Sequence, residues 1–278
     1  MGSNTKIRTR TDSSLVRVII PIYKNTLNEL EATSLKQSFK ILKNHHFSLI
    51  CPENLDIQPI LNFEKNNTIE VVRFPNEYFK GIEGYNRLML SEEFYEKFLE
   101  SKYILICQTD VIVIKDELEY WCSKNYDYIG APWIASSRNF WNKSMLTIRN
   151  LFNKKKKSSL HFFKVGNGGF SLRNVSKHYE VVTKHKKEIE YYQQNRVPEK
   201  LHIEDMFFSL KAPKLIKDFK IPDYREALGF AMDRKPRLAL RINNNKLPFA
   251  LHGFDKPKVR KFWKPIIKSI FYDKTEEE

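Results

Sequence analysis

The sequence predicts an α/β protein with a mixed, mostly parallel sheet flanked by helices. Two observations predict this fold class. Short apolar runs of strand length alternate with stretches whose apolar residues recur at helical spacing. The runs are nearly continuous rather than alternating with polar residues, as in strands buried on both faces. Such alternation favours a Rossmann-type arrangement, in which crossover helices join neighbouring parallel strands.

Strands and helices alternate most clearly in the first 110 residues. Four strands are expected here, at residues 16–22, 47–52, 69–74 and 103–107. Amphipathic helices are expected between them, over residues 27–42 and 85–99. Further along, the apolar pattern predicts strands ending near residues 133 and 172, a helix through about Tyr192, and another helix beginning near Glu204.

One domain accounts for most of the chain. The 278 residues, 41% of them hydrophobic, can bury a substantial core, and neither a repeat nor a composition break marks a second unit. Residues 15–255 are expected to form this domain, with a basic loop or lid at 136–164. Residues 1–14 are interpreted as a disordered N-terminus or tag, and residues 256–278 as a basic amphipathic tail.

Charge and cysteine content narrow the functional classes. The formal net charge of +15 implies attraction to phosphate, whether in nucleic acid, anionic lipid or a phosphorylated small molecule. Cys51, Cys107 and Cys122 lack metal-ligand spacing and predict reduced, buried thiols in a cytoplasmic protein. No run is apolar over the roughly 18 residues needed to span a bilayer.

Asp110 follows the strand at residues 103–107. A strand buried on both faces cannot hold an unpaired carboxylate, so Asp110 must lie at its end, face a cleft or have a partner. Ligands bind outside the carboxyl ends of such strands, and carboxylate oxygen is a preferred ligand of Mg²⁺ and Mn²⁺. The alternative is an aspartate that caps the following turn.

Two later motifs are consistent with a ligand site. Residues 166–169, Gly-Asn-Gly-Gly, allow the backbone to approach a ligand closely, although a simple tight turn is the alternative. Glu204 and Asp205 begin an apolar helix, where acids are favoured by the helix dipole. The functional alternative is a general base that takes a proton from an attacking hydroxyl group.

Six blocks, in this order and spacing, resemble glycosyltransferases of the GT-A fold. The resemblance is nearest to a bacterial and eukaryotic glycosyltransferase group long described as a domain of unknown function, and it spans about residues 16–255. The blocks are Val18–Tyr23, Gln108–Asp110, Tyr128–Trp133, Gly166–Arg173, Glu204–Ser209 and Leu251–Gly253.

The resemblance implies a divalent cation, Mn²⁺ or Mg²⁺, and a nucleotide-sugar donor. Asp110 stands where the Asp-x-Asp motif of such enzymes ends, and His252 matches the histidine that completes the metal shell. Gln108 replaces the first acid of the motif, and one carboxylate binds a cation more weakly than two. Lys256 resembles a phosphate-contacting lysine.

The resemblance also implies catalytic, donor-binding and sugar-binding residues. Asp205 matches the catalytic base of inverting members, with Glu204 as the second candidate. The segment around residues 251–257 also resembles glycogenin-like retaining enzymes, so the stereochemistry stays open. The implied donor-binding residues are Pro21, Tyr23, Asn86, Arg87, Thr109, Asp110 and Lys256. The implied sugar- or acceptor-binding residues are Trp133, Asn167, Gly168 and Gly169.

The C-terminal tail interleaves basic residues with apolar and aromatic ones from Lys258 to Phe271. This pattern suits an anionic membrane surface, which would place the protein at the inner face of the membrane with a lipid-linked or surface-polysaccharide saccharide as acceptor. The alternative is a helix packed on the body with a solvated basic face. Pro265 predicts a break in the helix.

Two other functions compete with a glycosyltransferase. A basic nucleic-acid-binding protein fits the charge, but the sequence has neither zinc-ligand spacing nor a recognition-helix pattern. A catalytically silent protein that binds a nucleotide sugar or glycan fits the presence of Gln108 in place of an acid. A nucleotidyltransferase would need a glycine- and lysine-rich loop after the first strand, and residues Tyr23-Lys24-Asn25 do not provide one.

Overall fold

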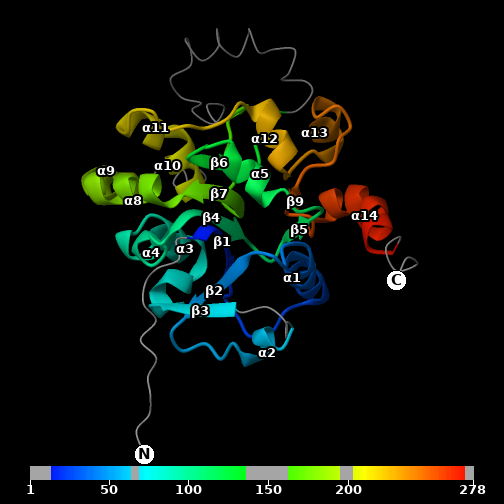
Figure 1. Ribbon diagram of the computed structural model, residues 1–278, viewed down its shortest axis with the longest axis horizontal. Coiled ribbons are helices and arrows are strands. Elements are labelled where there is room, and N and C mark those ends of the chain that lie inside the picture. Colours follow the sequence, from blue (N-terminus) through cyan, green and yellow to red (C-terminus); the bar gives the residue numbers. More distant parts are fainter. Residues whose placement is uncertain (1–13, 64–68, 136–161, 195–202, 273–278) are drawn as a thin grey trace, which may run out of the picture.

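The computed structural model describes residues 14–63, 69–135, 162–194 and 203–272 (Figure 1). Its centre is a six-stranded sheet with the order β3-β2-β1-β4-β7-β6. The four strands from β3 to β4 are parallel, and β7 runs antiparallel to both β4 and β6. The strands are β1 (Ser14–Pro21), β2 (His46–Pro52), β3 (Ile69–Phe74), β4 (Ser101–Cys107), β6 (Tyr128–Gly130) and β7 (Phe170–Asn174). The predicted mixed, mostly parallel sheet is therefore confirmed.

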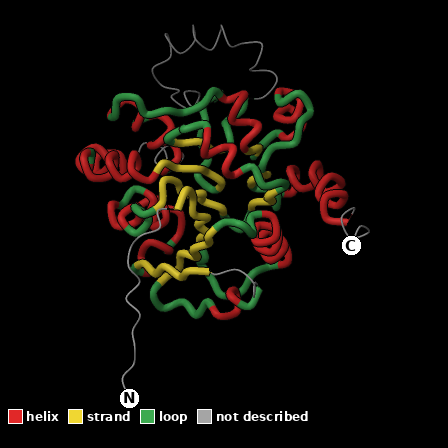
Figure 2. Tube along the Cα trace, in the orientation of Figure 1, coloured by secondary structure: helices red, strands yellow, loops and turns green. Residues whose placement is uncertain are grey.

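Helices cover both faces of this sheet, as Figure 2 shows around the central strands. Successive residues of β1 face opposite layers, because Val18 and Ile20 belong to one buried cluster and Ile19 to the other. The helices of the first half are α1 (Glu29–Ile41), α2 (Gln58–Leu61), the 3₁₀ helix η1 (Asn76–Phe79), α3 (Gly81–Met89), α4 (Glu92–Glu96) and α5 (Leu118–Ser123). Those of the second half are α8 (Val175–Lys184), α9 (Lys186–Gln194), α10 (Glu204–Leu210), α11 (Ala212–Leu215), α12 (Tyr224–Phe230), α13 (Pro236–Ile242) and α14 (Pro257–Tyr272).

Two expected helices are each divided into two shorter ones. The helix predicted over residues 85–99 is the pair α3 and α4, because Ser91 ends one and caps the next. The Ser91 hydroxyl accepts a hydrogen bond from the Phe94 N–H, as an N-cap residue does. Likewise, the helix expected through Tyr192 is interrupted at His185, where α8 ends and α9 follows.

A second, three-stranded sheet lies beside the first and has the order β5-β9-β8. Its strands are β5 (Val111–Val113), β8 (Ala231–Met232) and β9 (Ala250–His252). Strand β5 pairs antiparallel with β9, and β8 pairs parallel with β9. This small sheet therefore pairs the segment directly after β4 with strands from the C-terminal third of the chain.

The C-terminal helix α14 packs on the body of the protein. Val259 and the fully buried Trp263 join an apolar cluster with residues of α12, α13 and β9. The break predicted at Pro265 is wrong, since α14 runs through this residue. Proline has no N–H, so the carbonyl of Lys261, four residues before Pro265, lacks its usual helical hydrogen-bond donor. Lys261 is exposed, so water can donate to this carbonyl instead. The packed-helix alternative therefore describes α14.

None of the helices in the described part of the chain is long and apolar enough to cross a membrane. A loop or lid is expected at 136–164, and its residues 136–161 lie outside the described part of the chain. The three cysteines are buried free thiols, as the sequence predicts.

The packing of α14 predicts the effect of Trp263→Ala. Removing this fully buried indole should lower the free energy of unfolding by about 3–5 kcal/mol, measured from the urea midpoint. Lys264→Ala, at the exposed neighbouring position, is the control and should change stability by less than about 0.5 kcal/mol. Equal, small effects of both substitutions would contradict the packing of this helix.

Candidate functional site

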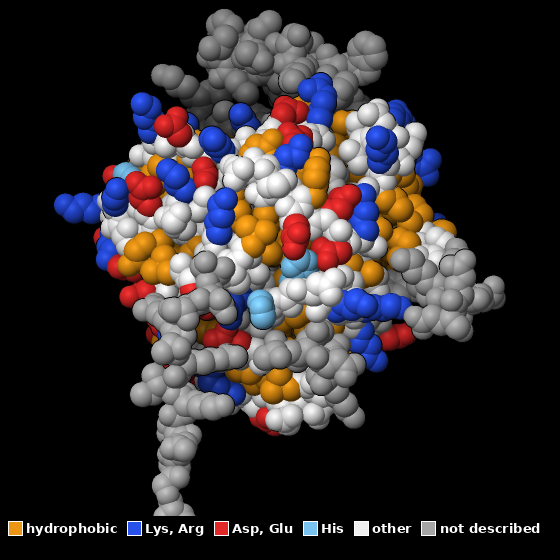
Figure 3. Space-filling model, in the orientation of Figure 1, with side chains coloured by type: hydrophobic (Ala, Val, Ile, Leu, Met, Phe, Trp, Pro, Cys, Tyr) orange, Lys and Arg blue, Asp and Glu red, His pale blue; other side chains and the backbone are white. Residues whose placement is uncertain are grey.

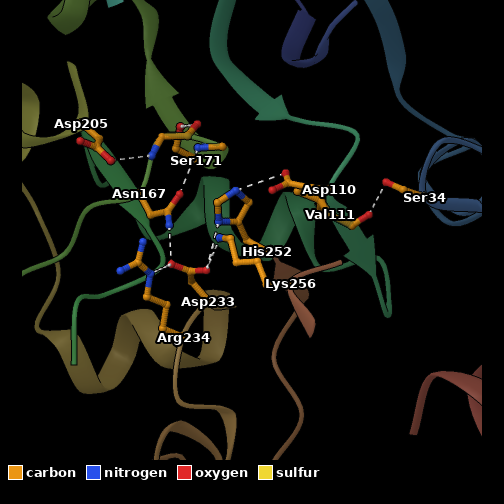
Figure 4. A network of polar contacts seen from close by, with 12 residues as sticks. Ser34, Asp110, Val111, Asn167, Ser171, Asp205, Asp233, Arg234, His252 and Lys256 are labelled. Atoms are coloured by element: carbon orange, nitrogen blue, oxygen red, sulfur yellow. Dashed lines mark hydrogen bonds and ion pairs between the residues drawn. The ribbon is translucent and has the colours of Figure 1, made fainter. Parts of the chain in front are cut away.

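The two predicted metal ligands, Asp110 and His252, lie side by side. Asp110 immediately precedes β5, and pairing of β5 with β9 sets Val111 opposite His252. The Asp110 carbonyl also accepts a hydrogen bond from the Gly253 N–H at 2.9 Å. As a result, Nε2 of His252 is 3.3 Å from Oδ1 of Asp110 (Figure 4). The small sheet thus joins two residues that are far apart in the sequence.

The charged forms of Asp110 and His252 stabilise one another. Burial disfavours the ionised form of Asp110, but His252 and then Lys256 outweigh it and hold the pKa of this carboxyl group below its ordinary value. Burial also disfavours a charged His252, but the Asp110 carboxylate raises the pKa of the imidazole above its ordinary value. The pair therefore concentrates opposite charges at the carboxyl end of β4.

The residues around Asp110 are suited to a divalent cation. Oδ1 of Asp110 is buried without a well-formed hydrogen bond, so it has a lone pair to offer. A methyl group added to Gly169 would overlap Nε2 of His252 and approach Oε1 of Gln108, so these two atoms converge on one small space. Carboxylate, neutral imidazole and amide oxygen are all ligands that Mn²⁺ accepts, so His252 would give up its proton to bind the ion. In the described ranges no three His, Cys, Asp or Glu side chains are grouped to hold a metal, and Asp110, His252 and Gln108 form the candidate set.

Asp233 is a further member of the site. It follows β8 directly, is buried, and accepts hydrogen bonds from Nδ2 of Asn167 at 2.9 Å and Nζ of Lys256 at 3.1 Å. Its Oδ1 is also 3.8 Å from Nδ1 of His252, so His252 lies between two carboxylates (Figure 4). The sequence analysis missed Asp233, although an acid after a short apolar run is the signal that identified Asp110.

The glycine-rich turn connects this cluster with the candidate base. Asn167 has a left-handed backbone conformation with φ of 64°, which turns the chain into β7. The N–H of Gly168 donates to Oδ2 of Asp205 at 3.3 Å. At the start of the turn, the indole of Trp133 lies where a side chain on Gly166 would be, which leaves no room for one. The turn therefore packs between Trp133 and Asp205.

Glu204 and Asp205 have different surroundings. Glu204 forms an ion pair of 3.1 Å with Arg173, and both side chains are almost completely buried. Asp205 has no cationic partner of this kind among the described residues, and burial followed by repulsion from Glu204 raises its pKa to about 7. Oδ1 of Asp205 and Oε2 of Glu204 both lack a hydrogen-bond partner in the described ranges. The ion pair of Glu204 with Arg173 is therefore what distinguishes the two acids.

The expected donor-binding residues separate into two groups. Pro21 ends β1, and Tyr23 follows it, 41% exposed and edge-on to the rings of Phe79 and Tyr85. Burial, then Tyr85 and Asp110, raise the pKa of Tyr23, so its hydroxyl is near enough to feel the charge of Asp110.

Asn86 and Arg87 make contacts within the protein instead. Oδ1 of Asn86 accepts a hydrogen bond from the Glu204 N–H at 3.1 Å, which supports the start of α10. Arg87 is exposed, and its guanidinium donates to the Glu77 carbonyl at 3.2 Å. Neither contact reaches Asp110.

A hollow of about 310 Å³ opens beside Asp110. Thr109 and Asp110 form one wall, and residues 28–31 at the start of α1, which include two glutamates, form another. Asp255, just before α14, and Arg260, from its first turn, complete the hollow, so Arg260 is its one cation among the described residues. The sequence pattern did not identify Arg260, which only the packing of α14 brings here.

A family model matches residues 68–252, more than half of the chain. The chain belongs to the family described as "Protein of unknown function (DUF5672)". The family region contains Asp110, Asp205, Asp233 and His252. A comparison with curated proteins found no match.

The solved structures that are similar to this chain include a mannan synthase, a mannosyltransferase and a galactosyltransferase. Core-mannan synthase A (CmsA/Ktr4) from Aspergillus fumigatus, in its Mn/GDP form, is 11% identical over 63% of this chain and 62% of that chain, with a TM-score of 0.38. The mannosyltransferase Ktr4p from S. cerevisiae, in complex with GDP, is 11% identical over 66% and 63%, with a TM-score of 0.43. The galactosyltransferase LgtC, in complex with donor and acceptor sugar analogues, is 14% identical over 85% and 86%, with a TM-score of 0.42. This chain thus spans less than two thirds of the first two structures, and its site is interpreted below from its own residues.

The raised pKa of Asp205 predicts how stability depends on pH. In the unfolded chain this carboxyl titrates near its ordinary value of about 4, so between about pH 4 and pH 7 the folded protein binds the additional proton. The free energy of unfolding therefore falls as pH rises from about 4 to about 7. Asp205→Asn should remove the loss and make the variant more stable than the parent at about pH 8, by on the order of a few kcal/mol, measured by urea unfolding.

The control for this comparison is Asp56→Asn, an exposed carboxyl group far from α10 in the sequence. Its stability should follow that of the parent at each pH. If Asp205→Asn and the parent lose stability in parallel between about pH 4 and pH 8, Asp205 is not the titrating group.

Proposed function

We propose that this protein transfers a sugar from a nucleoside-diphosphate sugar to a hydroxyl group of a saccharide acceptor. The observation that carries the proposal is that Asp110 and His252 come together beside Gly169, while Asp205 accepts a hydrogen bond from the N–H of the neighbouring Gly168. A cation-binding pair and a base with a pKa of about 7 are the two groups that such a transfer needs. The family model carries no function of its own, so the chemistry is argued from these residues.

Asp110, His252 and Gln108 would hold a divalent cation, Mn²⁺ or Mg²⁺. When bound, this ion would neutralise the charge that develops on the departing nucleoside diphosphate. Thr109 and Arg260 line the hollow next to Asp110, and the ammonium group of Lys256 is close enough to influence its pKa. These groups can donate to phosphate oxygens, as charged side chains do in other diphosphate sites.

Asp205 would act as the general base. Its unpartnered Oδ1 can take the proton of the acceptor hydroxyl while the hydroxyl oxygen forms a bond to the anomeric carbon. The bond from that carbon to the diphosphate breaks, and the diphosphate leaves with the electron pair. A direct displacement of this kind inverts the anomeric configuration. Glu204 is the weaker candidate because its charge is engaged by Arg173.

Tyr23 and Trp133 are suited to the two ends of the donor. The exposed ring of Tyr23 extends the carboxyl end of β1, where it can border the nucleotide base. Trp133 covers Gly166 and lies beside the glycine-rich turn, where an indole can stack on a sugar ring. Asn167, Gly168 and Gly169 would contact the sugar or the acceptor through their backbone.

The positive charge of α14 is the basis for the proposed acceptor and location. The exposed lysines of α14 favour an anionic membrane surface, which is consistent with a lipid-linked or surface-polysaccharide acceptor and with a cytoplasmic protein at the inner face of the membrane. Because the apolar side of α14 packs on the body, this contact would depend on charge rather than on insertion. Free buried cysteines suit a reducing compartment.

The proposal is tested by ligand-dependent thermal stability. Nucleoside diphosphates and nucleotide sugars should stabilise the protein only with Mn²⁺, by about 2.7 kcal/mol at a hundredfold excess over the dissociation constant. Asp110→Ala should lose this stabilisation, whereas Asp56→Ala, a matched loss of one exposed carboxylate, should keep it. Stabilisation by none of the nucleotides would refute a donor site. Stabilisation without sugar transfer would favour the silent binding protein that Gln108 makes plausible.

Gln108 itself gives a second prediction. Gln108→Glu keeps the length of the side chain and adds a carboxylate where Oε1 approaches His252, so Mn²⁺ should bind about tenfold more tightly, measured by calorimetry. Glu117→Gln, which changes an acid to an amide on the same segment outside the site, should leave the affinity unchanged. Unchanged affinity in Gln108→Glu would show that this side chain does not face the cation.

A further inference from the structure

A second cationic hollow lies between α13 and α14, away from Asp110. Its volume is about 730 Å³, within the range of about 300–1,000 Å³ that is typical of ligand pockets. Arg237 and Arg241 of α13 line one side, and Lys258 and Lys261 of α14 line the other. Lys235, just before α13, also lines the hollow, but its ammonium group donates to the Ile134 carbonyl at 3.0 Å. We call this hollow the α13–α14 cleft. Figure 1 places the two helices next to each other at one edge of the molecule.

The charges of the cleft have no acidic partner among the described residues. No acidic side chain in that part of the chain lines the cleft. Residues 233–268 contain eleven lysines and arginines but only two acids, Asp233 and Asp255. Asp233 already binds Lys256, and Asp255 lines the hollow beside Asp110. Within the described ranges, the four cations on the two helices are therefore available to an external anion.

Some basic side chains elsewhere on the described surface are paired with an acid. Lys24, Lys124 and Lys186, for example, lie 2.5–3.4 Å from a glutamate oxygen. Four cations that line one hollow without an acid raise the local potential and repel each other, and a bound anion relieves both effects. This grouping of cations around one hollow distinguishes the cleft from single basic side chains on the surface.

The walls of the cleft are partly apolar and partly preorganised. Leu238 and Phe262 line it together with the cations, and the guanidinium of Arg237 lies 5.9 Å from the ring centre of Phe262. This contact limits the rotamers of Arg237 before any ligand binds. Figure 3 shows basic side chains around an apolar area at the right of the view, where Figure 1 places these helices.

We propose that the α13–α14 cleft is a second phosphate-binding site. Its ligand is a phosphate or diphosphate group on a molecule whose neighbouring part is apolar, so that the phosphate meets the four cations and the apolar part meets Leu238 and Phe262. The site is separate from the candidate donor site, because no residue lining the cleft lines the hollow beside Asp110. It does not depend on the proposed transfer reaction.

Binding of inorganic diphosphate in the presence of a metal chelator tests the proposal, since the chelator silences the metal-dependent donor site. The variant Arg241→Gln/Lys261→Gln removes one cation from each wall and should weaken binding at least about tenfold. The variant Lys214→Gln/Lys217→Gln removes the same charge from exposed positions outside the cleft and outside α14, and should change binding less than about twofold. Equal weakening in both variants, or no binding by the parent, would overturn the proposal.

A parallel measurement identifies where the phosphate is carried. Vesicles of phosphatidylcholine with phosphatidylglycerol are sedimented with the parent and with both variants, and vesicles of pure phosphatidylcholine serve as the blank. Vesicle binding that is lost only in Arg241→Gln/Lys261→Gln assigns the cleft to a lipid phosphate. Cleft-dependent binding of diphosphate without vesicle binding assigns it to a soluble phosphate ester. Unfolding curves of both variants that match the parent establish that the substitutions act on binding.

Discussion

The buried ion pair between Arg173 and Glu204 determines how the rest of the site is arranged. Arg173 comes from β7 and Glu204 begins α10, so the pair joins the central sheet to the helix that carries Asp205. Two buried charges are costly unless they are well hydrogen-bonded. Here Arg173 also donates to the hydroxyl groups of Tyr95 and Ser171. Because the Arg173 guanidinium contacts both Glu204 and the Gly168 carbonyl, these bonds hold the start of α10 beside the glycine-rich turn.

Two aspartates of the site, Asp110 and Asp205, differ in charge environment rather than in chemistry. His252 and Lys256 hold the pKa of Asp110 below its ordinary value, and Asp233 contacts the same two residues. Asp205 is buried next to Glu204 without an ion pair of its own among the described residues, so its pKa is raised and a proton is held more readily there. Carboxyl groups whose pKa values are separated in this way can serve different purposes within one site. Both environments meet at the glycine-rich turn, where Gly169 lies against His252 and the neighbouring Gly168 donates to Asp205.

Local patterns in the sequence predicted the strands and much of the site, while long-range contacts escaped them. The apolar runs identified β1 to β4, and an acid at a strand end identified Asp110, because both signals are local. The split between α3 and α4 was missed because the capping role of Ser91 competes with a continuous apolar stripe. Arg260 could not be predicted, since only the packing of α14 brings it near Asp110.

The small sheet β5-β9-β8 has a consequence for protein synthesis. Asp110 leaves the ribosome well before His252, and their strands can pair only after β9 has been made. Until then the chain holds the central strands, but Asp110 lacks the histidine that lies beside it. A nascent or truncated chain that ends before β9 would consequently be unable to bring Asp110 and His252 together, so the candidate site is complete only when nearly the whole domain exists.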